Sequence, residues 1–305
     1  MPTGWQVLDF TGFDGVLAYK RGQLAILCEK EIVKSIPLAQ LAVILVGSST
    51  TFSGAVLQKL SEHDAAILVC DWKHVPVAAA YPWKEHSRIA ARQIAQAELS
   101  LPRRKNAWAQ IVKAKIFGQA ATLNIVDSKG AKYLYSVAQG VKSGDPSNQE
   151  ALAARFYWRR LTADPTFRRL PGIGESDING CLDYAYAILR GHGIRAVVSA
   201  GLCGTIGVFH HGRSNPFALV DDLIEPFRPA IDHYVINKLD NFCVDEPDVR
   251  RQLVGFIESA FSGTGHTIPT VFMQFAQEYG RYVEGDLQRL IPPTWKGLPS
   301  ASEKK

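Results

Sequence analysis

The spacing of apolar residues changes near residue 80 of the chain. Before that point they form short strand-like runs bounded by polar or glycine-containing turns. The runs are WQVLDF, GVLAY, QLAILCE, IVKSIP, LAVILVG and AAILVCDW, with one helix-like insertion, FSGAVLQKLSEHD. From Glu85 onward the apolar positions recur with helical period. The helical segments are SRIAARQIAQAEL, NAWAQIVKAKIFGQAATL, NQEALAARFYWRRL, GCLDYAYAILRGHG, PFALVDDLIEPFRP, VRRQLVGFIESAF and VFMQFAQEYGRYVEGDLQRLI.

This change of period predicts an α+β protein of two domains. Residues 1–80 are expected to form a small N-terminal β domain, and residues 81–290 a larger all-helical domain that carries the chemistry. Residues 291–305 end in PSASEKK and are expected to be a disordered tail. A length of 305 residues with 47% hydrophobic residues is sufficient for two cores.

Composition narrows the class of protein. The net charge of +5 permits a polyanionic partner without requiring one. The five cysteines are odd in number and contain no CxxC pair, which argues against a disulfide framework or a structural zinc site and favours a reducing cytoplasm. We expect neither secretion nor a membrane partner, because no leader pattern or apolar run of spanning length is present.

One stretch concentrates charge in apolar surroundings: GVFHHGRSNPFALVDDLIEPFRP, residues 207–229. Asn215 followed by a proline predicts a helix start, so a helix is expected to run through the acidic cluster. On such a helix Asp221 and Glu225 are four residues apart and Asp222 and Glu225 three apart, so their side chains share a face. Like charges at this spacing repel, and we expect a cation to compensate them.

Each candidate residue also has a purely structural interpretation. Ser147 and Glu150 satisfy the S-x-x-E capping box, and on physics alone capping is at least as good an explanation of Glu150 as catalysis. His210 is compatible with a loop histidine that binds a backbone carbonyl. The acidic cluster is compatible with a solvated helix face. Taken together, however, one imidazole and several carboxylates suit Mg²⁺ or Mn²⁺, which prefer hard oxygen ligands.

Several ordered motifs resemble the CRISPR-associated integrase family, the first protein of the spacer-acquisition module. They are LSEHDAAILVCDWKHVP, WAQIVKAKIFGQAATL, NQEALAARFYW, AYAILRGHGIRAVVSAGL and the 207–229 stretch, and the similarity runs from about residue 35 to about residue 235. The resemblance implies a β domain followed by a helical one. It also implies a metal site of Glu150, His210 and Glu225, which match the family's motif positions, with Asp222 as an accessory acid.

The activity implied by the resemblance is a divalent-metal-dependent DNA integrase and endonuclease of CRISPR adaptation. In that reaction the 3′-hydroxyl of a short DNA fragment attacks a phosphodiester in the repeat array. The implied partners are double-stranded DNA, contacted by Arg155 and Arg228, and a second CRISPR-associated protein. A homodimer built through the β domain is also implied. Two alternatives stay open: a stand-alone metal-dependent nuclease, and a non-catalytic DNA-binding scaffold.

Overall fold

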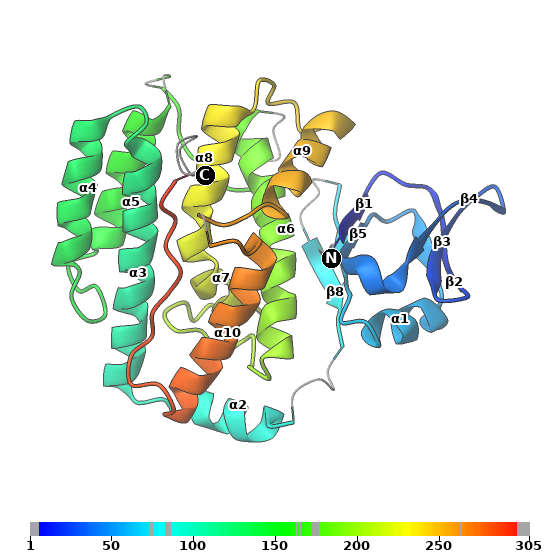
Figure 1. Ribbon diagram of the computed structural model, residues 1–305, viewed down its shortest axis with the longest axis horizontal. Helices are drawn as coiled ribbons and strands as arrows, with labels where there is room; N and C mark the ends of the chain where they lie inside the picture. Colours follow the sequence, from blue (N-terminus) through cyan, green and yellow to red (C-terminus); the bar gives the residue numbers. More distant parts are fainter. Residues whose placement is uncertain are drawn as a thin grey trace.

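The computed structural model describes residues 6–297, apart from 73–75, 83–86, 163, 165, 173–176 and 263. A strand-rich N-terminal part is followed by a larger, mostly helical part, as the sequence predicts (Figure 1). Among the described residues, no helix is both long and apolar enough to cross a membrane.

The N-terminal part contains two four-stranded sheets that enclose a small core. The first sheet has the order β1 (Gln6–Phe10), β5 (Leu41–Val46), β7 (Ala66–Cys70), β8 (Pro76–Ala80), in which β1, β5 and β7 are parallel and β8 is antiparallel. The second has the order β4 (Glu31–Pro37), β3 (Gln23–Cys28), β2 (Gly15–Lys20), β6 (Thr50–Phe52). Helix α1 (Gly54–Ser61) is the expected insertion. Strands β6 and β8 are not predicted from the sequence. Strand β6 has only three residues, and β8, with the sequence PVAAA, consists mainly of alanine.

The apolar run of β5 is covered within a single chain. All six of its residues are buried, between the N-terminal core on one face and helix α6 (Ile178–Ser199) on the other. The close approach of α6 depends on Gly191, because a Cβ there would lie 2.6 Å from Leu68 Cδ1. The run therefore does not need a second subunit to cover it.

Helices build the remainder of the molecule around α3 and α6. Their bounds are α2 (Ile89–Ala97), α3 (Leu101–Leu123), α4 (Ser128–Gly140), α5 (Gln149–Leu161), α7 (Ala218–Leu223), the 3₁₀ turn η2 (Glu225–Phe227), α8 (Arg228–Lys238), α9 (Pro247–Ile257) and α10 (Ile268–Glu284). Helix α3 contacts α4, α5, η2 and α8. Helix α5 and the η2–α8 segment, which are distant from each other in sequence, therefore both lie against α3 (Figure 1). The helix α4 is not among the predicted segments, although its buried residues Ala131, Leu134, Val137 and Ala138 have helical spacing.

The expected helix over residues 216–229 is interrupted. Helix α7 begins at Ala218, and Asn215 Oδ1 accepts a hydrogen bond from the Phe217 amide ahead of the helix. Helix α7 ends before Glu225, where Pro226 enters the η2 turn, because proline has no N–H to continue the α-helical ladder. Asp221 and Glu225 therefore do not share a continuous helix face.

The segment expected to be a disordered tail is ordered as far as the structure describes it. Residues 291–297 lie against α3 and α8, and Trp295 is 1% exposed. The indole Nε1 donates a hydrogen bond to Thr122 Oγ1 over 3.1 Å. Burial of one large aromatic ring outweighs the polar composition around it. Residues 298–305 lie outside the described part.

Polar contacts fix the two parts to each other. The Tyr184 hydroxyl on α6 donates to Asp9 Oδ2 over 2.6 Å, and Arg250 on α9 lies 3.2 Å from the same oxygen. The Val7 amide donates to Glu258 over 2.8 Å. The β1 strand is thereby tied to α6, to α9 and to the C-cap residue of α9 in the helical part.

Candidate active site

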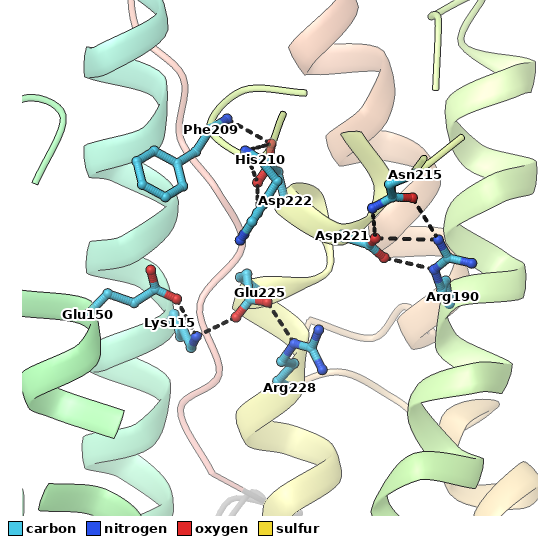
Figure 2. Close-up of polar contacts among 10 residues, drawn as sticks. All are labelled: Lys115, Glu150, Arg190, Phe209, His210, Asn215, Asp221, Asp222, Glu225 and Arg228. Atoms are coloured by element: carbon cyan, nitrogen blue, oxygen red, sulfur yellow. Dashed lines mark hydrogen bonds and ion pairs between the residues drawn. The ribbon is translucent and has the colours of Figure 1, made fainter. Parts of the chain in front are cut away.

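The carboxylates of the acidic stretch point into three different environments (Figure 2). Asp221 accepts from Arg190 Nε over 2.7 Å and from the side-chain amide of Asn215. Asp222 is fully buried and faces His210, whereas Glu225 faces Lys115 and Arg228. Each carboxylate has its own positively charged or donor partner, which removes the repulsion that their spacing implies.

Glu150 is placed at the start of α5 without serving as its cap. The Asp145 carboxylate accepts from the amides of Gln149 and Glu150, over 2.9 and 3.0 Å, and Asn148 Oδ1 accepts from the Ala151 amide. These acceptors satisfy the helix N-terminus. The Glu150 side chain turns instead toward α3, so the capping-box interpretation of this glutamate is wrong.

Lys115 on α3 joins the two candidate glutamates. Its Nζ lies 2.6 Å from Glu150 Oε1 and 2.5 Å from Glu225 Oε2. The other oxygen of Glu225, Oε1, accepts from Arg228 Nε over 2.7 Å. A chain of alternating charges therefore runs from α5 through α3 to the η2 turn and α8 (Figure 2).

His210 is oriented by Asp222. Its Nδ1 lies 2.5 Å from Asp222 Oδ1, and the Asp222 carboxylate also accepts from the backbone amides of Phe209 and His210. A carboxylate accepts only, so the neutral imidazole carries its proton on Nδ1 and keeps the Nε2 lone pair available. Gly207 permits this turn, because a Cβ there would lie 2.3 Å from the His210 carbonyl oxygen.

The three predicted ligands gather from separate elements of the fold. Glu150 comes from α5, His210 from the loop after α6, and Glu225 from η2. In Figure 2 the imidazole of His210 points toward the side on which Glu150 and Glu225 lie. His211, its neighbour, is exposed and takes no part in these contacts. The structure therefore brings together residues that are far apart in sequence.

The charged groups of the site shift one another's pKa values. Burial would raise the pKa of Glu225, but the Arg228 and Lys115 cations outweigh it and lower the pKa to about 2. Burial would lower the pKa of Lys115, but Glu225 and Glu150 outweigh it and raise the pKa. The hydrogen bond to Asp222 is the main cause that raises the pKa of His210, with Glu225 and Glu150 adding to it. Glu225 and Lys115 are therefore both charged at neutral pH.

The donor set suits a hard divalent cation. Two carboxylates and the Nε2 of one imidazole are ligands that Mg²⁺ and Mn²⁺ accept, and Asp222 supplies the outer carboxylate that commonly orients such a histidine. Within the described ranges, no three His, Cys, Asp or Glu side chains are already arranged as a ligand cluster. Here the Lys115 ammonium stands between Glu150 and Glu225 and holds a positive charge where their oxygens converge.

The two arginines expected to contact DNA have different surroundings. Arg155 is exposed on α5, five residues after Glu150, beside Arg159. Arg228 is partly buried, is paired with Glu225, and its guanidinium lies 4.5 Å from the centre of the Tyr186 ring. Arg155 is therefore accessible to solvent, whereas Arg228 is held by Glu225.

Lys115 and Asp145 belong to the site but were not singled out from the sequence. Lys115 has a recognisable signal, because it continues the buried α3 face that contains Trp108, Ile111 and Val112. A lysine among core positions calls for an anionic partner. Asp145 carries no such signal, since its role depends on a turn whose conformation is not evident from the residues.

Comparison with known proteins identifies similar chains. A family model described as CRISPR associated protein Cas1 matches residues 10–256. The CRISPR-associated endonuclease Cas1 of Neisseria meningitidis is 35% identical over 228 residues, which cover 73% of this chain and 72% of that protein.

Solved structures share the fold. A casposase bound to an integration product superposes with a TM-score of 0.74 at 18% identity, covering 99% of this chain and 97% of the casposase chain. A Cas6-RT-Cas1–Cas2 complex contains a chain that superposes with a TM-score of 0.75 at 19% identity, covering 98% of this chain and 37% of that one. At 18% and 19% identity, these structures show that the fold is shared.

Proposed function

The chain belongs to the CRISPR-associated protein Cas1 family, and we propose that it is a metal-dependent DNA integrase and endonuclease of CRISPR adaptation. The reaction is an exchange of phosphodiesters. The 3′-hydroxyl of a short DNA duplex loses its proton and forms a bond to the phosphorus of a repeat phosphodiester. The bond from that phosphorus to the former 3′-oxygen of the repeat breaks, and the leaving oxygen takes up a proton.

One observation supports this proposal: Glu150 of α5 and Glu225 of η2 contact the same Lys115 ammonium, and the imidazole of His210 points toward their side (Figure 2). Glu150 is released from capping by Asp145, and His210 is held by Asp222 with Nε2 available. A structural role for each residue alone would not require two glutamates from separate elements to share one ammonium group.

Mg²⁺ or Mn²⁺, held by Glu150, His210 and Glu225, would stabilise the charge that develops on the phosphoryl oxygens and favour ionisation of the attacking hydroxyl. The protein residues position these ligands. Asp222 keeps the proton of His210 on Nδ1, and Arg228 fixes Glu225 through Oε1. Arg155, exposed on α5 five residues after Glu150, is available to a DNA phosphate.

We further propose that the chain acts on double-stranded DNA together with a second CRISPR-associated protein. The casposase that shares this fold is bound to an integration product, and the Cas6-RT-Cas1–Cas2 complex contains Cas2. A homodimer through the N-terminal part is part of the same proposal. Exposed apolar side chains next to the edge strand β8 support it, since Trp72 is 82% exposed and Val77 65% exposed.

The test is an incubation of the purified protein with a supercoiled plasmid that carries repeats and with short duplexes ending in 3′-hydroxyls. We expect plasmid-linked duplex with Mn²⁺ and none with a chelator. A stand-alone nuclease would cut the plasmid without joining, because water would replace the 3′-hydroxyl. A scaffold would bind DNA with no dependence on metal. Either result would overturn the proposed integrase.

A further inference from the structure

We propose that the ammonium group of Lys115 occupies the cation position between Glu150 and Glu225 and is displaced when the divalent metal binds. Lys115 would thereby set the affinity of the site for metal. This inference rests on the metal-dependent function proposed above and deepens it, because it assigns a role to a residue outside the ligand set.

The position of the ammonium is the first argument. Lys115 Nζ lies 2.6 Å from Glu150 Oε1 and 2.5 Å from Glu225 Oε2, so one oxygen of each glutamate is directed at the same positive charge (Figure 2). The Lys115 side chain is 12% exposed and that of Glu225 is 7% exposed. Water therefore screens these contacts only weakly, and the ammonium is the cation that holds the two carboxylates together.

Competition follows from this geometry. A divalent ion bound by Glu150 and Glu225 needs oxygens directed at the place the ammonium now holds. Two positive centres within a few ångströms of each other in a buried site repel strongly. The metal and the ammonium cannot both be held between Glu150 and Glu225, and one must leave as the other enters.

The charge balance indicates where the ammonium goes. Without metal, the carboxylates of Glu150 and Glu225 are balanced by Lys115 and Arg228. A divalent ion adds two positive charges, so the site then has an excess of positive charge that DNA phosphates can balance. The four-carbon stem of lysine lets the ammonium swing while its backbone stays on α3. The displaced group is then available to a phosphate oxygen near the metal.

The first experiment compares Mn²⁺ binding by the wild type, Lys115→Met and Lys113→Met. Binding is measured from the electron paramagnetic resonance signal of unbound Mn²⁺. Lys113 is the matched control, because it lies on the same helix but lines a different hollow with Gln110, Phe117 and Arg289. We expect Lys115→Met to bind Mn²⁺ at least roughly tenfold more tightly than wild type, since a competing charge is removed. Lys113→Met should match wild type.

Lys115→Met is expected to have the opposite effect on the rate of strand joining. At saturating Mn²⁺ we expect this variant to join DNA more slowly than wild type, because the ammonium that would meet a phosphate is missing. A residue that only stabilises the fold would weaken metal binding and joining together. Tighter metal binding combined with slower joining therefore separates displacement from a structural role.

The second experiment uses the unaltered protein and does not depend on whether a variant folds. An amine-reactive acetylating reagent is applied with and without Mn²⁺, and modification of individual lysines is measured by mass spectrometry. We expect Mn²⁺ to increase acetylation of Lys115 severalfold and to leave Lys113 unchanged. Unchanged reactivity of Lys115, or equal or weaker Mn²⁺ binding by Lys115→Met, overturns the inference. Absence of Mn²⁺ binding by both proteins would instead refute the proposed metal site, and the inference with it.

Discussion

The Nδ1 of His210 lies 2.5 Å from Oδ1 of Asp222, a carboxylate with no solvent exposure. This contact sets both the tautomer of the imidazole and its affinity for a proton. It therefore links the acidic turn to the pH at which the site can accept a metal.

The Asp222→Asn variant is expected to shift the acid limit of activity to lower pH. The hydrogen bond to Asp222 is the main cause of the raised pKa of His210. As pH falls through that raised pKa, His210 takes up a proton on Nε2 and cannot act as a ligand. Removing the charge of Asp222 lowers the pKa, so protonation should require more acid.

Strand joining measured between pH 5 and 8 at fixed Mn²⁺ checks this expectation. Asp221→Asn is the control, because Asp221 pairs with Arg190 rather than with His210. It should leave the acid limit where the wild type has it. An unchanged limit in Asp222→Asn would mean that His210 protonation does not govern metal binding.

Asp145→Ala is expected to destabilise the protein by about 1 to 2 kcal/mol, the usual cost of losing a helix N-cap acceptor. Asp145 accepts from two amides at the start of α5, including that of Glu150. Loss of this anchor should also slow strand joining, because Glu150 is less well positioned. Calorimetric unfolding together with a joining assay measures both effects. A fully stable variant would show that Asn148 alone caps α5.

Asp232 is expected to make stability depend on pH. Burial outweighs its hydrogen bonds from Tyr157 and Tyr186 and raises its pKa to about 6. Because the native pKa exceeds that of the unfolded chain, the native state binds this proton more tightly, and the stabilisation from it is lost as pH rises from about 4 to 6. Asp232→Asn does not titrate, so its stability relative to wild type should increase over that range.

The size of this change should be on the order of 3 kcal/mol, from a shift of about two pKa units. Urea unfolding of both proteins at pH 4, 5, 6 and 7 measures it. A constant difference between Asp232→Asn and wild type across these pH values would mean that Asp232 keeps an ordinary pKa.

Trp295→Ala is expected to cost about 3 to 5 kcal/mol of stability, as for other large buried aromatic side chains. The ring is 1% exposed and packs against His233 and Phe261. Trp72→Ala serves as the control, because Trp72 is 82% exposed and its removal should cost much less. Equal effects of the two substitutions on thermal unfolding would contradict the ordered position of residues 291–297.

Local patterns predicted most of the elements but not how they meet. The change of period near residue 80 correctly separates strands from helices, and six of the strands match the apolar runs. The break at Pro226 was overlooked, although proline is visible in the sequence, because the apolar period continues through it. The residues of β5 predict a buried strand, but not that α6 of the same chain covers it.

The sequence motifs name candidate ligands but not the residues that surround them. Glu150, His210 and Glu225 follow from motifs, and their role as metal ligands stays a prediction. Lys115 continues the buried face of α3, which predicts an anionic partner, but which carboxylates pair with it depends on the packing of α3 against α5 and η2. The distinct environments of Asp221 and Asp222 also depend on tertiary contacts, since neighbouring residues of one short helix face Arg190 and His210.

The most direct test of the metal-dependent integrase is a comparison of His210→Ala with His211→Ala. The two histidines are adjacent and exposed, and of these two only His210 is hydrogen-bonded to Asp222 in the described part of the chain. We expect both variants to bind duplex DNA like the wild type, because phosphate attraction comes from lysines and arginines. With Mn²⁺, His211→Ala should join 3′-hydroxyl duplexes to the plasmid normally, and His210→Ala should form no joined product. Normal joining by His210→Ala would contradict the proposed site.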